Sequence, residues 1–267
     1  MYVYCPELVN PFFLHVYFGM EEYALGHDYQ IFLTRTFDRG MICQGRFDGF
    51  LFPVYNSSEV MDGIHFLRDM NLPFVISDFQ DILRNDIPTV SVNVEGAGWK
   101  AADHLLELGH DDILFATATI DPKWVGIQRC CASRGRRASL FLFSNGEGKI
   151  RNYFNLGAQC AQDIARMAKV PTAIIAANDE IAVGLINGLT RLGYHVPNDI
   201  SVIGFDDAYI AAYSNPSLTT IHYPKTRIGM EMAKMLIGTI TGAPVDTYVQ
   251  FETEFVLRES TASPRNP

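Results

Sequence analysis

The sequence predicts an α/β protein with two parallel β-sheets. Short, continuously apolar runs such as Ala173–Ala177 alternate along the chain with amphipathic stretches. Uninterrupted apolar runs are typical of parallel strands covered on both faces, and strands that alternate with helices indicate βαβ units. About ten such runs are many for one open sheet. No Pro-, Gly- or Ser-rich linker divides the chain, so we expect two lobes between which the chain crosses more than once.

Ten segments are predicted to be strands and five to be helices. Glycine follows three of the helices, and a glycine just past a helix end supplies the left-handed residue that closes it. We therefore expect that conformation at Gly26, Gly109 and Gly193. The predicted strands are Tyr2–Cys5, Gln30–Thr34, Gly49–Pro53, Phe74–Ser77, Thr89–Val92, Ile113–Ala116, Leu140–Phe143, Ala173–Ala177, Ser201–Phe205 and Thr219–His222. The predicted helices are Phe12–Leu25, Ser58–Met70, Ala97–Leu108, Asp179–Leu192 and Lys225–Ile240.

The composition is that of a globular protein that does not hold DNA by itself. The chain has 267 residues, of which 48% are apolar and 19% are charged. Its formal net charge is −9, whereas a domain that holds DNA alone needs a basic face. The only dense basic cluster in the sequence is Arg129, Arg134, Arg136 and Arg137.

Neither a membrane span nor a disulfide framework is expected. No run of about 18 apolar residues occurs, and the start of the sequence, Met1–Pro6, lacks the features of a signal peptide. The cysteine count is odd and no CxxC occurs, which indicates reduced thiols in a cytoplasmic protein, most of them small core residues. The cysteines are Cys5, Cys43, Cys130, Cys131 and Cys160.

We expect no catalytic site, no metal and no cofactor. The sequence contains no GxSxG, no phosphate-binding GxxxxGK[ST] and no GxGxxG. No histidine has metal-ligand spacing, and packing or capping is the favoured role for His104 and His110, which flank a helix end. The histidines are His15, His27, His65, His104, His110, His195 and His222.

Two polar residues follow predicted strands at positions suited to a ligand. Asp206 follows Ser201–Phe205, and Asn178 follows Ala173–Ala177. In open parallel sheets, ligands bind beyond the carboxyl ends of the strands. A carboxylate there can accept two hydroxyl hydrogen bonds, but Asp and Asn are also good helix N-caps. Position alone leaves a ligand role and a capping role open for both residues.

Two adjacent aromatic residues, Phe12 and Phe13, open the first predicted helix. Pro11 suits the first position of that helix. The two rings either pack the helix onto the core, which is the favoured interpretation, or form the apolar wall of a small-ligand site.

Several segments resemble the signatures of LacI/GalR-type repressors. The clearest are PTAIIAANDEIAVG at residues 171–184 and VPNDISVIGFDD at residues 196–207. The resemblance runs nearly from end to end and is strongest in the C-terminal part. The other similar segments are Asn10–Phe13, His104–His110, Pro216–Ile221 and Val256–Thr261.

The resemblance implies a type I periplasmic-binding-protein-like core, with two Rossmann-like lobes, three crossovers and a small effector in the cleft between the lobes. By the matching motifs, Phe12 and Phe13 would stack on the effector ring. Asn178 and Asp206 would hydrogen-bond its hydroxyls, and Asp78 would lie at the rim.

Three segments depart from the family pattern. The stretch that corresponds to the family's cleft arginine, Gln128–Gly135, does not follow it, so Arg129 is expected in that role, with Arg134 as the alternative. Val92–Val94 lacks the carboxylate of the family's VDN, and Arg35–Asp48 is shorter than the usual helical crossover.

The resemblance also implies lobe boundaries and partners. We expect an N-terminal lobe of residues 1–116 plus 223–246, a C-terminal lobe of residues 117–222 plus 247–262, and a tail of residues 263–267. The sequence starts at the first core strand, so operator DNA is expected as a partner only through a helix-turn-helix headpiece that this sequence lacks. A homodimer is implied, because the family pairs its cores to span two DNA half-sites.

The expected function is that of a cytoplasmic, ligand-sensing core that transmits lobe closure to the headpiece of a sugar-responsive repressor. The alternative is an extracytoplasmic sugar-binding protein of the same fold. That alternative needs a signal peptide or a lipoprotein cysteine, and Cys5 lacks the preceding apolar region. Sugar, sugar phosphate and purine stay open as effectors, as do induction and corepression.

Overall fold

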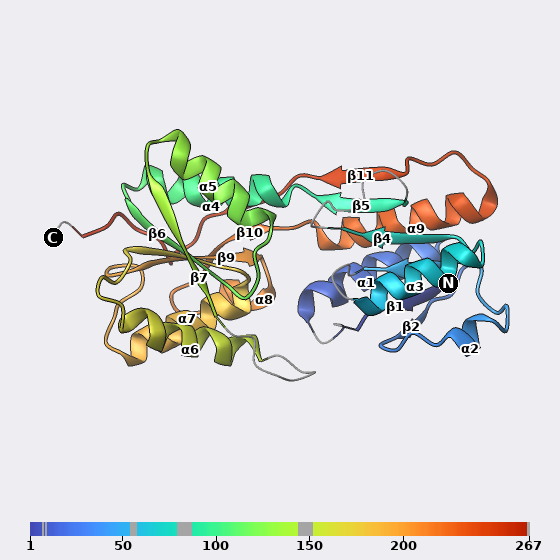
Figure 1. Cartoon of the computed structure of the whole chain (residues 1–267), viewed down its shortest axis with the longest axis horizontal. Coiled ribbons are helices and arrows are strands. Elements are labelled where there is room, and N and C mark those ends of the chain that lie inside the picture. Colours follow the sequence, from blue (N-terminus) through green and yellow to red (C-terminus); the bar gives the residue numbers. More distant parts are fainter. Residues whose placement is uncertain (7, 9, 54–57, 79–86, 144–151, 266–267) are drawn as a thin grey trace. The chain divides into compact units, whose positions relative to one another are not determined.

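Among the residues that the structure describes, the strands form two six-stranded sheets in two structural units (Figure 1). The computed structural model describes residues 1–6, 8, 10–53, 58–78, 87–143 and 152–265. Met1–Asn93 and Pro224–Glu252 make up the first unit, and Val94–Tyr223 and Thr253–Pro267 make up the second. The chain therefore passes from one unit to the other three times, which agrees with the three crossovers implied by the resemblance.

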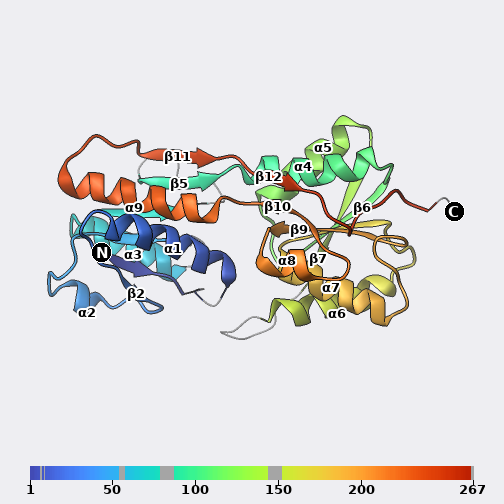
Figure 2. The same cartoon turned by 180° about the vertical axis from the view of Figure 1, so that it is seen from behind.

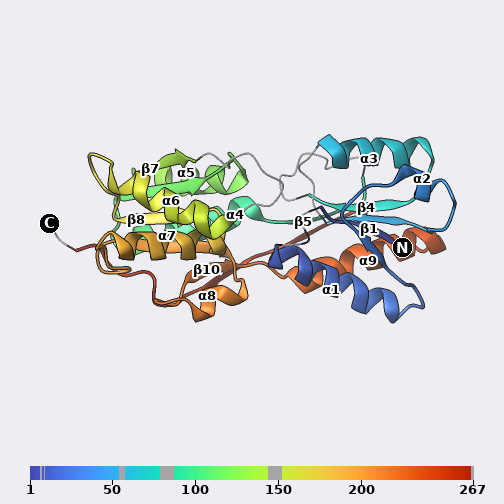
Figure 3. The same cartoon turned by 90° about the horizontal axis from the view of Figure 1, so that it is seen from below.

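The sheet of the first unit is parallel throughout and has helices on both faces. Its strand order is β11-β5-β4-β3-β1-β2. In Figure 3, α2 and α3 cover one face of this sheet, and α1 and α9 cover the other. The elements are β1 (Tyr2–Tyr4), α1 (Pro11–Leu25), β2 (Phe32–Thr34), α2 (Arg39–Ile42), β3 (Phe50–Phe52), α3 (Ser58–Asp69), β4 (Phe74–Ser77), β5 (Thr89–Val92), α9 (Lys225–Thr241) and β11 (Tyr248–Phe251).

The sheet of the second unit has the same layered arrangement, with α4 and α5 on one face and α6 and α7 on the other (Figure 1). Its order is β12-β10-β9-β8-β6-β7, and only β12 is antiparallel; it lies beside β10 (Figure 2). The elements are α4 (Val94–Glu107), β6 (Asp112–Thr117), α5 (Pro122–Ser133), β7 (Arg137–Leu142), α6 (Tyr153–Ala165), β8 (Ala173–Ala176), α7 (Asp179–Arg191), β9 (Ser201–Asp206), α8 (Tyr209–Tyr213), β10 (Thr219–His222) and β12 (Glu254–Val256).

The unit boundaries differ from the expected lobe boundaries in four places, one of which is the single residue Tyr223, expected in the N-terminal lobe but part of the second unit. Residues 94–116, expected in the N-terminal lobe, belong to the second unit, because α4 packs on α5 and β6 pairs with β7 and β8. Residues 247–252, expected in the C-terminal lobe, belong to the first unit, because β11 pairs with β5. The expected tail is attached to the second unit through the Arg265–Asp199 ion pair of 2.8 Å.

All ten predicted strands and all five predicted helices are present, to within a few residues at their ends. Strands β11 and β12 were not predicted, because they are partly exposed edge strands without a continuous apolar run. Gly109 and Gly193 adopt the expected left-handed conformation, with φ of 95° and 90°. The expectation for Gly26 was wrong: its φ is −65°, and the positive φ falls on Asp28.

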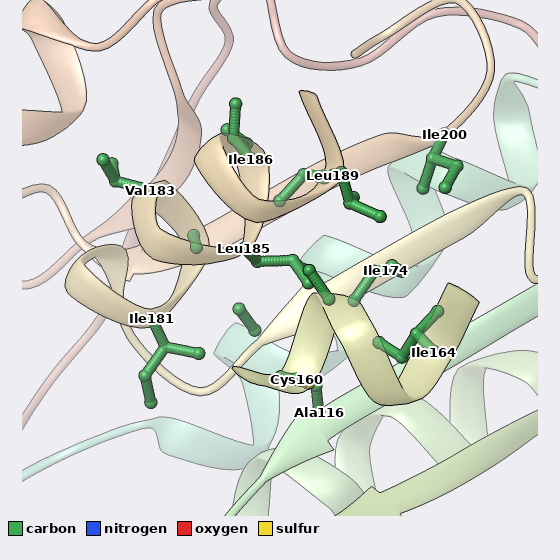
Figure 4. Packing of buried hydrophobic residues seen from close by; sticks show 14 of the residues in the cluster. Ala116, Cys160, Ile164, Ile174, Ile181, Val183, Leu185, Ile186, Leu189 and Ile200 are labelled. Atoms are coloured by element: carbon green, nitrogen blue, oxygen red, sulfur yellow. The ribbon is translucent and has the colours of Figure 1, made fainter. Parts of the chain in front are cut away.

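One buried cluster in each unit differs from the other in its side chains. In the first unit, the cluster that joins β1, β3 and α3 is rich in rings: Tyr2 and Phe37 meet edge to face, and Phe37 and Phe52 are tilted by 35°. In the second unit, the cluster between α6, α7 and β8 is aliphatic, and residues of α7 such as Leu185 and Leu189 pack against α6 and β8 (Figure 4).

Three helix pairs cross where glycines face the backbone of the partner helix. A Cβ on Gly229 of α9 would overlap the carbonyl of Val16 on α1, and one on Gly19 would overlap the carbonyl of Thr226. The α4–α5 and α6–α7 pairs repeat this arrangement in the second unit. The glycines there are Gly98, Gly126, Gly157 and Gly184.

Candidate functional site

Polar residues lie at the carboxyl ends of four neighbouring strands in the second unit. Thr117 ends β6, Asn178 follows β8, Asp206 ends β9 and His222 ends β10. Asp206 and His222 are register partners. Because parallel strands bring their carboxyl ends to one edge, this edge is the candidate site.

The turn that follows β9 is strained. Asp206 has φ of 105° and Asp207 has φ of 50°, a left-handed backbone that residues other than glycine rarely adopt. Such conformations cost about 1–3 kcal/mol each and persist only where the surrounding structure stabilises them. The next helix, α8, has Ala208 as its N-cap, with no side-chain cap bond. The capping alternative for Asp206 is therefore wrong.

Asp207 is held in an ion-pair network. Its carboxylate accepts hydrogen bonds from Arg258 Nη2 at 2.6 Å and from His222 Nδ1 at 3.0 Å. Burial favours the neutral acid, but Arg258 and His222 outweigh it and hold the pKa of Asp207 below its ordinary value. Both carboxylate oxygens of Asp207 thus accept hydrogen bonds from other side chains of the second unit. The adjacent Asp206 is the last residue of β9 and supplies the carboxylate at the strand end.

Beneath this turn lies the buried carboxyl of Asp179, the first residue of α7. Its Oδ2 accepts a hydrogen bond from the Ala208 N–H at 2.7 Å, and its Oδ1 accepts one from Thr220 Oγ1 at 2.6 Å. Burial, assisted by the charge of Asp206, raises the pKa of Asp179 well above its ordinary value, although these two hydrogen bonds oppose the shift.

Asn178 is an N-cap in the structure, which agrees with one of its two expected roles. Its Oδ1 accepts a hydrogen bond from the Ile181 N–H of α7 at 2.8 Å. Capping uses the carboxamide oxygen, and the amide NH₂ group is a separate pair of donors. The cap fixes the side chain at the strand end and does not exclude a ligand contact.

Lys123 lies at the same edge and was not singled out in the sequence. Its Nζ lies 3.0 Å from Asp121 Oδ2 and 5.3 Å from the ring centroid of Phe205, and only 15% of its side chain is exposed. Asp121 caps α5, and Pro122 begins that helix. This Asp-Pro start signal could have indicated the helix, and with it a lysine just past β6.

The two arginines expected near the effector lie in exposed ion pairs. Arg129, two-thirds exposed, pairs with Glu95 of α4, and Arg134 pairs with Asp103 of the same helix. Arg136 likewise pairs with Asp111. Carboxylates thus partly neutralise the basic cluster seen in the sequence, which weakens it as a contact for DNA.

The remaining expected contacts belong to the first unit. Phe12 and Phe13 are both buried, as the favoured core interpretation expects, and their rings meet edge to face at 5.1 Å. Asn10 caps their helix by accepting a hydrogen bond from the Phe12 N–H at 2.9 Å. Asp78 follows β4 and is also buried; its carbonyl accepts a hydrogen bond from Ser91 Oγ at 2.7 Å.

Within the described part of the chain, no group of three or more His, Cys, Asp or Glu side chains could hold a metal ion. None of the helices in those residues has the length and apolar character that a membrane crossing requires.

Residues 102–261 match the family described as a periplasmic binding protein-like domain. The HTH-type transcriptional repressor PurR of Aliivibrio fischeri strain MJ11 is 31% identical over 94% of this chain and 77% of its own length. The chain belongs to the LacI family of transcriptional regulators. It corresponds to the effector-binding core of these regulators, and the resemblance seen in the sequence is confirmed.

Solved structures agree with this family assignment. A LacI family regulator from Enterococcus faecium, solved with bound ribose, is 26% identical and superimposes with a TM-score of 0.85 over 98% of both chains. A second ribose-bound regulator, from Enterococcus faecalis V583, is 26% identical, with a TM-score of 0.82 over 98% of both chains.

Proposed function

We propose that this LacI-family core senses a sugar and that Asp206 is the main polar contact of that effector. Asp206 ends a buried strand, so the sheet holds its backbone. An ionised carboxylate accepts hydrogen bonds from two neighbouring hydroxyls, and a hydrogen bond to a charged group contributes about 1.5–3 kcal/mol. The strongest support is the positive φ of Asp206, because backbone strain of this kind clusters at functional sites.

Two further groups at this edge complete the proposed contacts of the second unit. Asn178 offers its amide NH₂ group, and Lys123 offers a largely buried ammonium beside Phe205. All three cations are paired with a carboxylate, but Lys123 is largely buried beside Phe205. We propose it as the cationic contact in place of Arg129 or Arg134, whose ion pairs with α4 are more exposed. Both hydrogen-bond donors and acceptors are then present, as the hydroxyls of a sugar require.

On the resemblance, Phe12 and Phe13 remain the proposed stacking residues and Asp78 the proposed rim residue in the first unit. The ribose-bound relatives support a sugar rather than a purine as the first effector to test.

In the full-length protein, we propose that effector binding is transmitted by lobe closure to a DNA-binding headpiece, without any catalytic step. A ligand shifts such an equilibrium only through its different affinity for the two states. We further propose a cytoplasmic homodimer. The rings of Tyr209 and Tyr213 on α8 stack on each other and are 74% and 69% exposed, which supports a protein interface on the second unit.

The test is calorimetry of wild type and Asp206→Ala with a panel of sugars that includes D-ribose. The variant should bind between tenfold and a few hundredfold more weakly, at about 1.4 kcal/mol per decade, while its unfolding temperature stays close to that of wild type. Equal affinities would show that the effector site lies elsewhere.

A further inference from the structure

The two backbone amides that follow Asp206 are both hydrogen-bonded by side chains beneath the β9 turn, one by the Asp179 carboxyl and one by the Thr220 hydroxyl. The Ala208 N–H donates to Asp179 Oδ2 at 2.7 Å, and the Asp207 N–H donates to Thr220 Oγ1 at 3.4 Å. Thr220 Oγ1 in turn bonds Asp179 Oδ1 at 2.6 Å. Asp179 and Thr220 are both fully buried, so water does not compete for these hydrogen bonds.

The position of the Asp179 carboxyl depends on a glycine in β9, Gly204, which has no side chain. A Cβ on Gly204 would overlap Asp179 Oδ1 and crowd Leu218. The carboxyl therefore occupies the space that a side chain at residue 204 would fill. This space lies two residues before Asp206, near the carboxyl end of β9. The connection crosses three elements, from α7 through Asp179 to β9 and β10.

We propose that Asp179 is a positioning residue for effector binding, which holds Asp206 in its strained backbone conformation through the Ala208 N–H and Thr220. The proposal rests on the proposed function, because Asp206 has to be the effector contact. Asp179 itself, being fully buried, does not touch the effector. It acts by offsetting the cost of the two left-handed residues, so that the Asp206 carboxylate is already aimed before the effector arrives.

The chemical form of Asp179 suits this role. Its pKa is raised, chiefly by burial, so the carboxyl stays neutral to a higher pH than an ordinary aspartate, and the neutral form adds no repulsion to the charge on Asp206. An asparagine has the same shape as this neutral acid: its oxygen can accept from the Ala208 N–H, and its NH₂ can donate to Thr220 Oγ1. A leucine has a similar volume and can do neither.

The experiment therefore compares Asp179→Asn, Asp179→Leu and Thr220→Val, each alone and combined with Asp206→Ala. With D-ribose as the calorimetric probe, Asp179→Asn should bind within about threefold of wild type, whereas Asp179→Leu should bind at least about tenfold more weakly. Thr220→Val keeps the volume of the side chain and should give a smaller loss in the same direction. In proteins that also carry Asp206→Ala, none of the three changes should alter ribose affinity further, because each acts on binding only by positioning Asp206.

A second readout needs no ligand. Amide hydrogen exchange in the ligand-free protein should be at least about tenfold faster at Ala208 in Asp179→Leu than in Asp179→Asn, with β6 and β8 unchanged. Normal protection of Ala208 in Asp179→Leu, or an equal loss of ribose affinity with and without Asp206, would overturn the proposal. If wild type does not bind D-ribose but Ala208 responds as expected, the sugar proposal fails and the control of the turn by Asp179 is upheld.

Discussion

The two units share a layered α/β architecture, yet one buried cluster in each is built from different side chains. The cluster beneath α3 in the first unit packs rings such as Phe50 and Phe52, whereas the cluster between α6 and β8 in the second unit packs branched aliphatic residues such as Ile164 and Ile174. Both sheets have six strands with helices on both faces. The comparison indicates that the alternation of apolar strands and amphipathic helices determines this layering, and that core chemistry can vary beneath it.

The carboxyl edges of the two sheets differ more than the cores do. In the first unit, the edge residues singled out are two buried rings, Phe12 and Phe13, and one buried acid, Asp78. In the second unit, acids and cations such as Asp207 and Arg258 form a continuous network beside a strained turn. The first unit thus places rings and a buried acid at this edge, whereas the second places charged groups and directed hydrogen bonds there.

The largest expected effect tests the comparison of the cores. Phe52→Ala in the first unit should destabilise the protein by about 3–5 kcal/mol, because a buried ring leaves a large cavity. Ile174→Val in the second unit should cost only about 0.5–1.5 kcal/mol, since it removes one methylene. Urea unfolding followed by circular dichroism measures both. A larger loss from Ile174→Val than from Phe52→Ala would show that the aliphatic core is the more tightly packed.

A feature that the units share gives the next largest effect. Gly229→Ala should cost about 1–3 kcal/mol, because the new Cβ overlaps the α1 backbone and the two helices must separate. The matched control is Gly26→Ala, which changes the C-cap residue of α1, the partner helix of α9. Its φ is −65° and its Cβ would make ordinary contacts, so it should leave stability unchanged or raise it slightly. Thermal unfolding that shifts equally for both variants would contradict the close approach of α1 and α9.

The difference between the edges predicts which cation matters for binding. Lys123→Met keeps an apolar stem beside Phe205 but removes the ammonium, and it should weaken sugar binding about tenfold. Arg129→Met removes an exposed ion pair and should change affinity less than about twofold. Calorimetry with the sugar that wild type binds best measures both. The reverse order would restore Arg129 as the effector contact.

Sequence patterns predicted the buried parts of the fold because those parts have a simple physical signature. Strands such as β8 are apolar on both faces, so each could be found without knowing its neighbours. Helix α5 was missed because Gly126 and the adjacent cysteines obscure its helical periodicity. Without that helix, Lys123 had no predicted place at the strand ends.

The sequence predicted a site residue only where the order of residues along the chain was enough to place it at the sheet edge. Asp206 follows an apolar strand directly, so its place at the sheet edge follows from the order of the residues. The role of Asp179 depends on β9 lying beside β10, which brings Thr220 next to it from 41 residues away. Such pairing between distant segments is not visible in a single sequence.

The smallest expected effect separates two acids of the second unit, the buried Asp179 and the partly exposed Asp207, by their pH dependence. The pKa of Asp179 is raised in the folded protein, so its contribution to stability is present at low pH and is lost as pH rises through the raised pKa. Asparagine does not ionise, so Asp179→Asn should gain stability relative to wild type between pH 4.5 and 7.5, by about 1 kcal/mol, the scale of a single ionisable group.

Asp207→Asn is the control of opposite sign. The pKa of Asp207 is lowered, so its contribution is present above its ordinary pKa and is lost as pH falls. This variant should therefore lose stability relative to wild type at pH 7.5, and the difference should shrink as the pH falls toward the lowered pKa. Urea midpoints of the three proteins at pH 4.5, 6.0 and 7.5 measure both trends. If the two variants follow wild type in parallel at every pH, neither carboxyl has the environment described, and the strained turn is held by packing alone.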